Sequence, residues 1–439
     1  MDHLNTMILK NNFFNLSNSH AAIFLNFFAK ASGILIIVYI ANTFDQNLFG
    51  IYSFLIALAG FFATFLKVGL PPYLIKKTSS LLARNRYFAL MSLWQLVGRY
   101  LLISFLFIST SLLLVFYVYP ISFKDIDFTD LSICILIAYS ITFSEIRSSM
   151  IRGTGHIKSG LIPENLIRPC VFIFTLYLTI NFLTLNISTI LLLFFGSYLI
   201  SNSLSQLVFS KITKQEIRPN IINNEYRFKL NPKELASYFS FSFLQIFMSQ
   251  FCILLFPFFS SYDELAVYRI SFAGGFLLTS ILIAIASANI NKFSTFYSQK
   301  DFKSLNSYAN KCSAMSFRYS LFFIVFSCLS APFIIDLILD KSYMASLVPF
   351  FIIAFGQLFN CAFGLSSSIL QISNYQYCNN VSLFISILIG IIIFSFLVSK
   401  SGAIGASIAY SASLLAYVSL SQFFCKIKIG FFVNPFIGK

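Results

Sequence analysis

Apolar stretches of about twenty residues recur along the whole chain, and no other feature limits its possible folds as strongly. A helix that crosses the hydrocarbon core of a bilayer needs about 20 mostly apolar residues. Only 10% of the 439 residues are charged, whereas soluble proteins carry about 25%. The sequence therefore predicts an all-α integral membrane protein. Twelve spans are expected, at 20–41, 49–70, 95–118, 130–150, 165–184, 187–210, 235–258, 266–289, 313–337, 346–371, 380–398 and 404–425.

Basic residues are distributed unequally between the two sides of these spans. If both termini are placed in the cytoplasm, the inner segments hold 23 Lys and Arg residues and the outer connections hold 3, Lys124, Lys341 and Lys400. Lys and Arg collect on the cytoplasmic side of membrane proteins. The split therefore predicts cytoplasmic termini and an even number of spans. It also explains the net charge of +15 without nucleic acid as a partner.

The chain is expected to consist of two related halves. Its longest connection, 211–234, is a cytoplasmic linker between six-helix bundles at 1–210 and 235–439. "GIYSFLIALAGF" matches "AVYRISFAGGFL" at a shift of 216 residues, which aligns Tyr52 with Tyr268, and "SSMIRGTGHIK" can be laid over "SSILQISNYQY" at a shift of 219. Two like-oriented six-helix repeats are an architecture of membrane transporters.

Lys30 stands in the middle of the first predicted span, where a charge costs about 2.5–3.5 kcal/mol even on the lenient insertion scale. Asn26 lies one turn away on the same helix face, so the two residues form a polar stripe. One interpretation is that Lys30 faces a solvated cavity. The other is that it is buried against a structural carboxylate, for which Glu145 is the nearest candidate in depth.

Further polar side chains lie inside the predicted spans or near their ends. The candidate binding residues besides Lys30 and Asn26 are Lys67, Arg99, Gln245, Gln250, Arg269 and Arg318. Lys67 and Arg99 are equally explained by snorkelling to the headgroups. Gln245 and Gln250, with Ser249, either join helices by hydrogen bonds or line a wet path. Glu145, Arg147 and Arg152 are expected to form a cytoplasmic gate network, or simply a solvated helix end.

Enzymatic and cofactor chemistry is not expected. The eight cysteines are scattered and the three histidines form no ligand cluster, so we expect no metal or other cofactor. A phosphate-binding G-x-x-x-x-G-K-[ST] motif does not occur, which argues against ATP use. The outer loops are short and acidic, unlike the large outer loop of a polysaccharide polymerase or ligase. The one D-x-D, 125–127, lies outside, where a glycosyltransferase finds no nucleotide sugar.

Five stretches resemble polysaccharide-unit exporters in their order and spacing. They are "FGIYSFLIALAGFFATFLKVGLPPYLIKK", "RGTGHIKSGLIPENLIRP", "YDELAVYRISF", "VPFFIIAFGQLFNCAFGLSSSILQISN" and "GAIGASIAYSASLLAY". Together they are similar to the O-antigen (Wzx-type) flippases of the multidrug/oligosaccharidyl-lipid/polysaccharide (MOP) exporter superfamily. The resemblance implies a V-shaped, MATE-like pair of bundles with a central cavity walled by the first, second, seventh and eighth helices. It thereby strengthens the case for Arg269.

The resemblance also implies what the protein does. The expected substrate is an undecaprenyl pyrophosphate-linked O-antigen unit, passed from the cytoplasmic to the periplasmic leaflet of the bacterial inner membrane during lipopolysaccharide biosynthesis. Polymerase and chain-length proteins of the pathway are further partners left open, as is H⁺ or Na⁺ coupling. A capsule or exopolysaccharide unit, or a drug substrate as in MATE exporters, are the alternatives. Related lipid-linked peptidoglycan precursor flippases carry Arg-x-x-Gly where this chain has Lys30-Ala31-Ser32-Gly33, so bidentate phosphate binding is not assumed.

Overall fold

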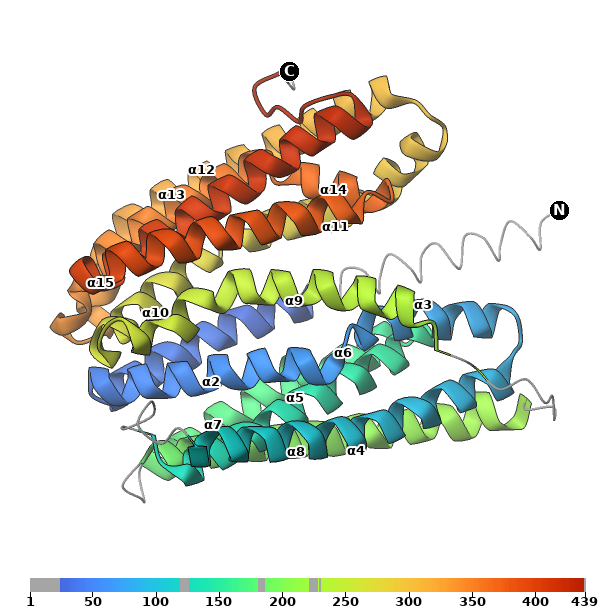
Figure 1. The fold of residues 1–439 in the computed structure, drawn as a ribbon, viewed down its shortest axis with the longest axis horizontal. Helices are drawn as coiled ribbons and strands as arrows, with labels where there is room; N and C mark the ends of the chain where they lie inside the picture. The colour runs from blue at the N-terminus through green and yellow to red at the C-terminus, as the bar shows by residue number, and fades with distance from the viewer. Residues whose placement is uncertain (1–23, 119–125, 181–185, 221–227, 229, 438–439) are drawn as a thin grey trace. The chain divides into compact units, whose positions relative to one another are not determined.

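The computed structural model describes residues 24–118, 126–180, 186–220, 228 and 230–437, and every regular element in this part of the chain is helical (Figure 1). Eleven of the described helices are long and apolar enough to cross a membrane. The last of them, α15 (Gln376–Ile429), contains both final predicted spans. The prediction of an all-α membrane protein with twelve spans is therefore confirmed. Residues 20–23 and 181–184 of the predicted spans lie outside the described residues.

The chain divides by packing into two compact units. Unit 1 comprises Met1–Ile36 and Leu58–Ser242, and unit 2 comprises Ile37–Ala57 and Phe243–Lys439. The boundary passes through three helices, Phe24–Thr43, α2 (Gln46–Lys67) and α9 (Pro232–Leu255). The domain division at 211–234 stays a prediction.

Unit 1 contains the end of α2 and the elements that follow it up to the beginning of α9. They are α3 (Leu70–Ala83), α4 (Tyr87–Val118), α5 (Phe128–Gly153), α6 (Ile157–Ile162), η2 (Pro163–Ile167), α7 (Arg168–Ile180), α8 (Ile187–Ile212), η3 (Thr213–Ile217) and η4 (Arg218–Asn220). Serines line the surfaces where α5 and α8 pack together. Ser140, Ser144 and Ser148 follow one face of α5 at intervals of four, and Ser197, Ser201 and Ser205 do the same on α8; all six are buried. Small residues at this spacing let membrane helices approach closely.

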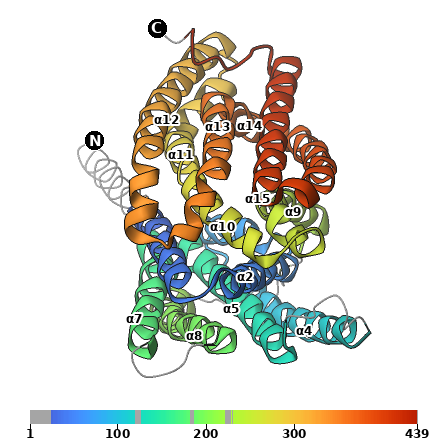
Figure 2. The ribbon, with the colours of Figure 1, turned by 90° about the vertical axis from the view of Figure 1, so that its left-hand side faces the viewer.

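Unit 2 contains the rest of α9 and the elements after it. They are η5 (Phe256–Phe258), α10 (Tyr262–Phe276), α11 (Thr279–Ser298), α12 (Phe302–Ile338), η6 (Lys341–Ser346), α13 (Leu347–Phe363), α14 (Leu365–Ile372) and α15. In this unit α13 packs against α10, α12 and α15 (Figure 2).

Several stretches expected as inner loops are helical instead. The predicted loop after the second span forms α3, whose buried residues Leu70, Leu74, Thr78 and Leu81 recur at helical spacing. This amphipathic face is shorter than a membrane span, which is why hydropathy alone missed it. Gly69 separates α3 from α2 with a positive φ of 70°, and a Cβ there would lie 2.5 Å from the backbone nitrogen of Phe239. Only glycine suits this position.

Two pairs of helices and one turn recur in the two halves at similar shifts. α2 and α10 begin 216 residues apart, at Gln46 and Tyr262, and α4 and α12 begin 215 apart, at Tyr87 and Phe302. The turn after α5 contains Gly155 with a positive φ of 95°, and 219 residues later Asn374 has a φ of 61° before α15. The internal repeat thus extends from sequence matches to helix starts and turn geometry.

Candidate functional site

Several charged side chains of unit 1 lie around a π turn. Helix α6 continues through this turn, η2, into α7. Pro169 lacks an N–H, and its ring conflicts with the carbonyl four residues earlier, so an α-helical pattern cannot pass through it undisturbed. The backbone N–H of Arg168 instead donates to the Pro163 carbonyl, five residues back. The Pro163 carbonyl also accepts a hydrogen bond of 2.6 Å from Ser201 Oγ on α8.

Five ionisable residues gather at this turn, and we call them the charge cluster: Lys67, Glu145, Arg152, Glu164 and Arg168. Lys67 Nζ lies 2.7 Å from Glu145 Oε1, and the lysine side chain is only 8% exposed while that of Glu145 is 34% exposed. Glu164, on the π turn, is within electrostatic range of the other four residues. Three cations and two carboxylates give the charge cluster a formal charge of +1. It can therefore attract an anion while keeping most of its own charges compensated.

Arg168 is held in place by its neighbours. Its Nη1 donates to Tyr198 Oη at 2.8 Å, its Nε donates to the Glu164 carbonyl at 3.2 Å, and its guanidinium lies 4.9 Å from the centre of the Tyr198 ring. The hydrogen bond to Glu164 supplies a partner for a carbonyl that the π turn frees from its usual α-helical bond. The turn and the cation thus stabilise each other.

Asn26 is the predicted site residue that contacts this turn directly. Its Oδ1 accepts a hydrogen bond of 2.9 Å from Asn165 Nδ2, next to Glu164. Lys30, one turn further along the helix Phe24–Thr43, is half-buried. The polar face of this helix therefore meets the π turn through Asn26. Whether Lys30 contacts a substrate stays a prediction; the ion pair that the structure shows for Glu145 is with Lys67.

The predicted gate residues on α5 do not share one face. Glu145 and Arg147 are two positions apart, so they point in different directions on a helix. Arg147 lies over the rings of Phe143 and Phe209, whereas Glu145 pairs with Lys67. Arg152 is within electrostatic range of Glu145 and Glu164 and donates to Ser149 Oγ at 3.1 Å. A gating role for these residues stays a prediction.

The remaining predicted binding residues are spread over both units. Arg99 is exposed on α4 in unit 1 and Arg318 is exposed on α12 in unit 2. Arg269 on α10 is half-buried, within electrostatic range of Tyr52 and Tyr268. On α9, Gln245 is exposed, whereas the Oε1 of Gln250 is buried without a hydrogen-bond partner among the described residues. No single unit brings all of these residues together.

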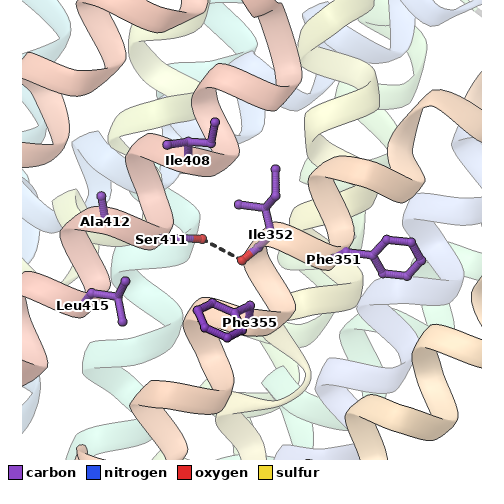
Figure 3. A pocket seen from close by; sticks show the side chains of 7 residues that line it. All are labelled: Phe351, Ile352, Phe355, Ile408, Ser411, Ala412 and Leu415. Carbon is purple, nitrogen blue, oxygen red and sulfur yellow. Dashed lines mark hydrogen bonds between the residues drawn. The ribbon is translucent and has the colours of Figure 1, made fainter.

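Unit 2 also has a groove of about 410 Å³ between α13 and α15 (Figure 3). The residues that line it include Phe351, Phe355, Ile408 and Leu415. The side chain of Ser411 provides the one hydroxyl in the lining, and this hydroxyl already donates to the Ile352 carbonyl at 3.0 Å. The lining carries no charge. The groove therefore has no group that could bind an anionic or cationic headgroup.

Sequence reasoning missed Glu164, Asn165, Arg168 and Tyr198. The predicted fifth span, 165–184, begins just after Glu164, so the sequence places Glu164 outside the span and predicts no site across its start. A signal was nevertheless present: Glu164 and Arg168 are four residues apart, with the acidic residue first, which is the favourable order for a helical ion pair.

Comparison with known proteins agrees with this architecture. No protein-family model and no curated protein sequence matches the chain. Among solved structures, an inward-facing multidrug resistance MATE family transporter of the MOP superfamily is similar, with a TM-score of 0.71 and 13% identity over 92% of this chain and 94% of its own. The lipid II flippase MurJ in an inward closed conformation is similar with a TM-score of 0.61 and 16% identity, over 93% and 89% of the two chains. The chain is a multi-pass membrane protein with the fold of these transporters and this flippase.

Proposed function

We propose that the protein flips undecaprenyl pyrophosphate-linked O-antigen repeat units from the cytoplasmic to the periplasmic leaflet of the bacterial inner membrane by alternating access. The observation that carries this proposal is the net positive charge of the charge cluster together with Lys30. The charge cluster is formally +1, and Lys30 adds a further cation on the helix that meets it through Asn26. A pyrophosphate is the anionic part of the proposed substrate.

The physical task explains why such groups are needed. The lipid tail of the substrate can stay in the bilayer, while its charged and hydroxyl-rich head must cross about 30 Å of hydrocarbon. Lysine offers a mobile point charge with three donors. Asparagine amides, such as those of Asn26 and Asn165, can both donate to and accept from sugar hydroxyls. The similarity in fold to a lipid II flippase over most of both chains supports the same class of substrate.

The proposal is tested by complementing a deletion strain of the source bacterium. We expect wild type to restore surface O-antigen, Lys30→Ala to lose it and Lys30→Arg to restore it partly or fully. Lipid-linked units facing the cytoplasm should accumulate in the deletion strain, which separates flipping from polymerisation. Full activity of the alanine variant, at equal protein level, would remove Lys30 from the mechanism. Restored capsule or exopolysaccharide in place of O-antigen would identify the alternative sugar unit.

A second candidate function, export of cationic drugs, is favoured by one specific observation. Glu164 puts a carboxylate at the π turn inside a candidate membrane span, and a MATE transporter is among the similar structures. If this function holds, expression should raise resistance to cationic drugs, and Glu164→Gln should abolish that resistance. If the flippase proposal holds, expression of neither the wild type nor Glu164→Gln should change drug susceptibility.

A further inference from the structure

A cavity of about 240 Å³ lies between α4 and α5 of unit 1, apart from the charge cluster. Its walls are apolar and aromatic, with Trp94, Leu102, Tyr139 and Phe143 among them, and its one charged residue is Arg147. A cation in otherwise apolar walls is costly unless an anion accompanies it. The cavity therefore fits a ligand that has both an anionic group and an apolar part.

Arg147 has hydrogen-bonding capacity to spare. Its guanidinium lies 5.0 Å from the centre of the Phe143 ring and 4.1 Å from that of Phe209. Its one hydrogen bond within the described part of the chain is a weak contact of 3.9 Å with Met150 Sδ, although a guanidinium carries five N–H donors. Among the residues that the structure describes, no carboxylate forms an ion pair with it. The two rings hold the planar group in position without satisfying its donors.

The α4 edge of the cavity is exposed and apolar. Leu102 is 60% exposed at its edge, and Ile103 and Leu106 beyond it are 68% and 62% exposed. The space beside Gly98 is open, because a Cβ added there would have no atom within 4 Å. Arg147 is six residues from the end of α5, which is about 9 Å along the helix. This depth is within reach of the headgroup region for an arginine side chain.

We propose that this cavity binds an anionic phospholipid of the surrounding membrane, with its phosphate on the Arg147 guanidinium and an acyl chain along Gly98, Leu102 and Leu106 of α4. Basic pockets between membrane helices near the cytoplasmic surface bind anionic headgroups in this way. A free phosphate would match the guanidinium but not the apolar mouth, whereas a phospholipid matches both. The bound lipid is a resident of the fold and not the transported substrate.

The chain provides its own reporter for this site. Trp94 is the only tryptophan and it lines the cavity, so lipids with brominated acyl chains will quench its fluorescence when they occupy the site. In bilayers of phosphatidylglycerol and phosphatidylcholine, we expect brominated phosphatidylglycerol to quench Trp94 at a lower mole fraction than brominated phosphatidylcholine. The preference should be about fivefold, the factor expected for one basic residue at a membrane surface.

Three variants make the test specific. Arg147→Gln should remove the preference for phosphatidylglycerol, while Lys158→Gln, which removes an exposed charge on α6, should keep it. Gly98→Leu should fill the mouth without a backbone clash and reduce quenching by both lipids. Equal quenching of the wild type by both lipids would overturn the proposal, and so would a preference that survives in Arg147→Gln. Loss of the preference on adding inorganic phosphate would show a site for free anions and overturn it as well.

Discussion

A lysine that closes a membrane helix can extend to the headgroups, but Lys67 turns to α5 and pairs with Glu145. The position of Lys67 near an inner helix end was visible in the sequence, and so was the depth of Glu145. Their pairing depends on the packing of α2 against α5, where Thr142 Oγ1 also donates to the Ala63 carbonyl at 3.3 Å. A contact across 78 residues of sequence leaves no periodic signal that a single chain could reveal.

The pair predicts a measurable loss of stability when one partner is removed. Lys67→Met leaves the Glu145 carboxylate uncompensated, which should lower the free energy of unfolding by about 2–3 kcal/mol. Unfolding in mixed detergent micelles measures this change. The double variant Lys67→Met/Glu145→Leu should lose less than the two single variants added together. The exposed Lys158→Met serves as the control, and a loss of equal size there would contradict a specific role for the pair.

At the scale of elements, breaks in helices decide where functional side chains point. Two breaks stand out, the π turn η2 and the kink inside α15. At the kink, Ser401 and Gly402 leave helical geometry, with a φ of 48° at the glycine. The Glu264 carboxylate accepts a hydrogen bond of 2.8 Å from the Ala403 N–H, so it caps the helix that begins there. A carboxylate at a helix N-terminus is stabilised by the helix dipole.

Gly402→Ala should destabilise unit 2 by about 1–3 kcal/mol, because the positive φ is strained for alanine and a Cβ would collide with the Glu264 carboxylate. Thermal unfolding of the purified protein in detergent checks this. Gly196→Ala on α8 is the matched control. A Cβ at Gly196 meets no atom within 4 Å, so this variant should be neutral or stabilising by up to about 1 kcal/mol. Similar melting temperatures for both variants would contradict the account of the kink.

Pro169→Ala should let the π turn relax toward an α-helix, because the missing N–H and the ring clash are both removed. Asn165 would then rotate away from Asn26. In a Cys170→Ser background, the pair Asn26→Cys/Asn165→Cys should be joined by a short thiol-specific cross-linker, and adding Pro169→Ala should lower the yield several-fold. An unchanged yield would mean that contacts such as Ser201 with the Pro163 carbonyl hold the turn without the proline.

At the scale of the whole molecule, the alternation of basic residues predicts how the chain crosses the membrane. The 23 to 3 split places His156, Lys300 and the C-terminus inside and Lys124, Lys341 and Lys400 outside. Single cysteines at Lys124 and Lys400 should therefore react with an impermeant maleimide in intact cells. A cysteine at His156 or Lys300 should react only after permeabilisation. The reverse pattern at any one of these sites would disprove the predicted orientation between the neighbouring spans.

What the sequence alone determined was the class of fold, because apolar length and the distribution of basic residues act locally and can be read one segment at a time. The twelve spans and the internal repeat followed from these patterns, and so did the polar stripe of Asn26 and Lys30. Only the tertiary structure decided which charges meet. Lys67 with Glu145, Asn26 with Asn165, and Arg147 between two aromatic rings depend on helix packing between residues far apart in the chain. Glu164 and Arg168 lie at the site because the helix continues through two prolines by forming a π turn. The intrinsic preference of proline opposes a continuous helix there, and contacts with neighbouring helices and side chains stabilise it.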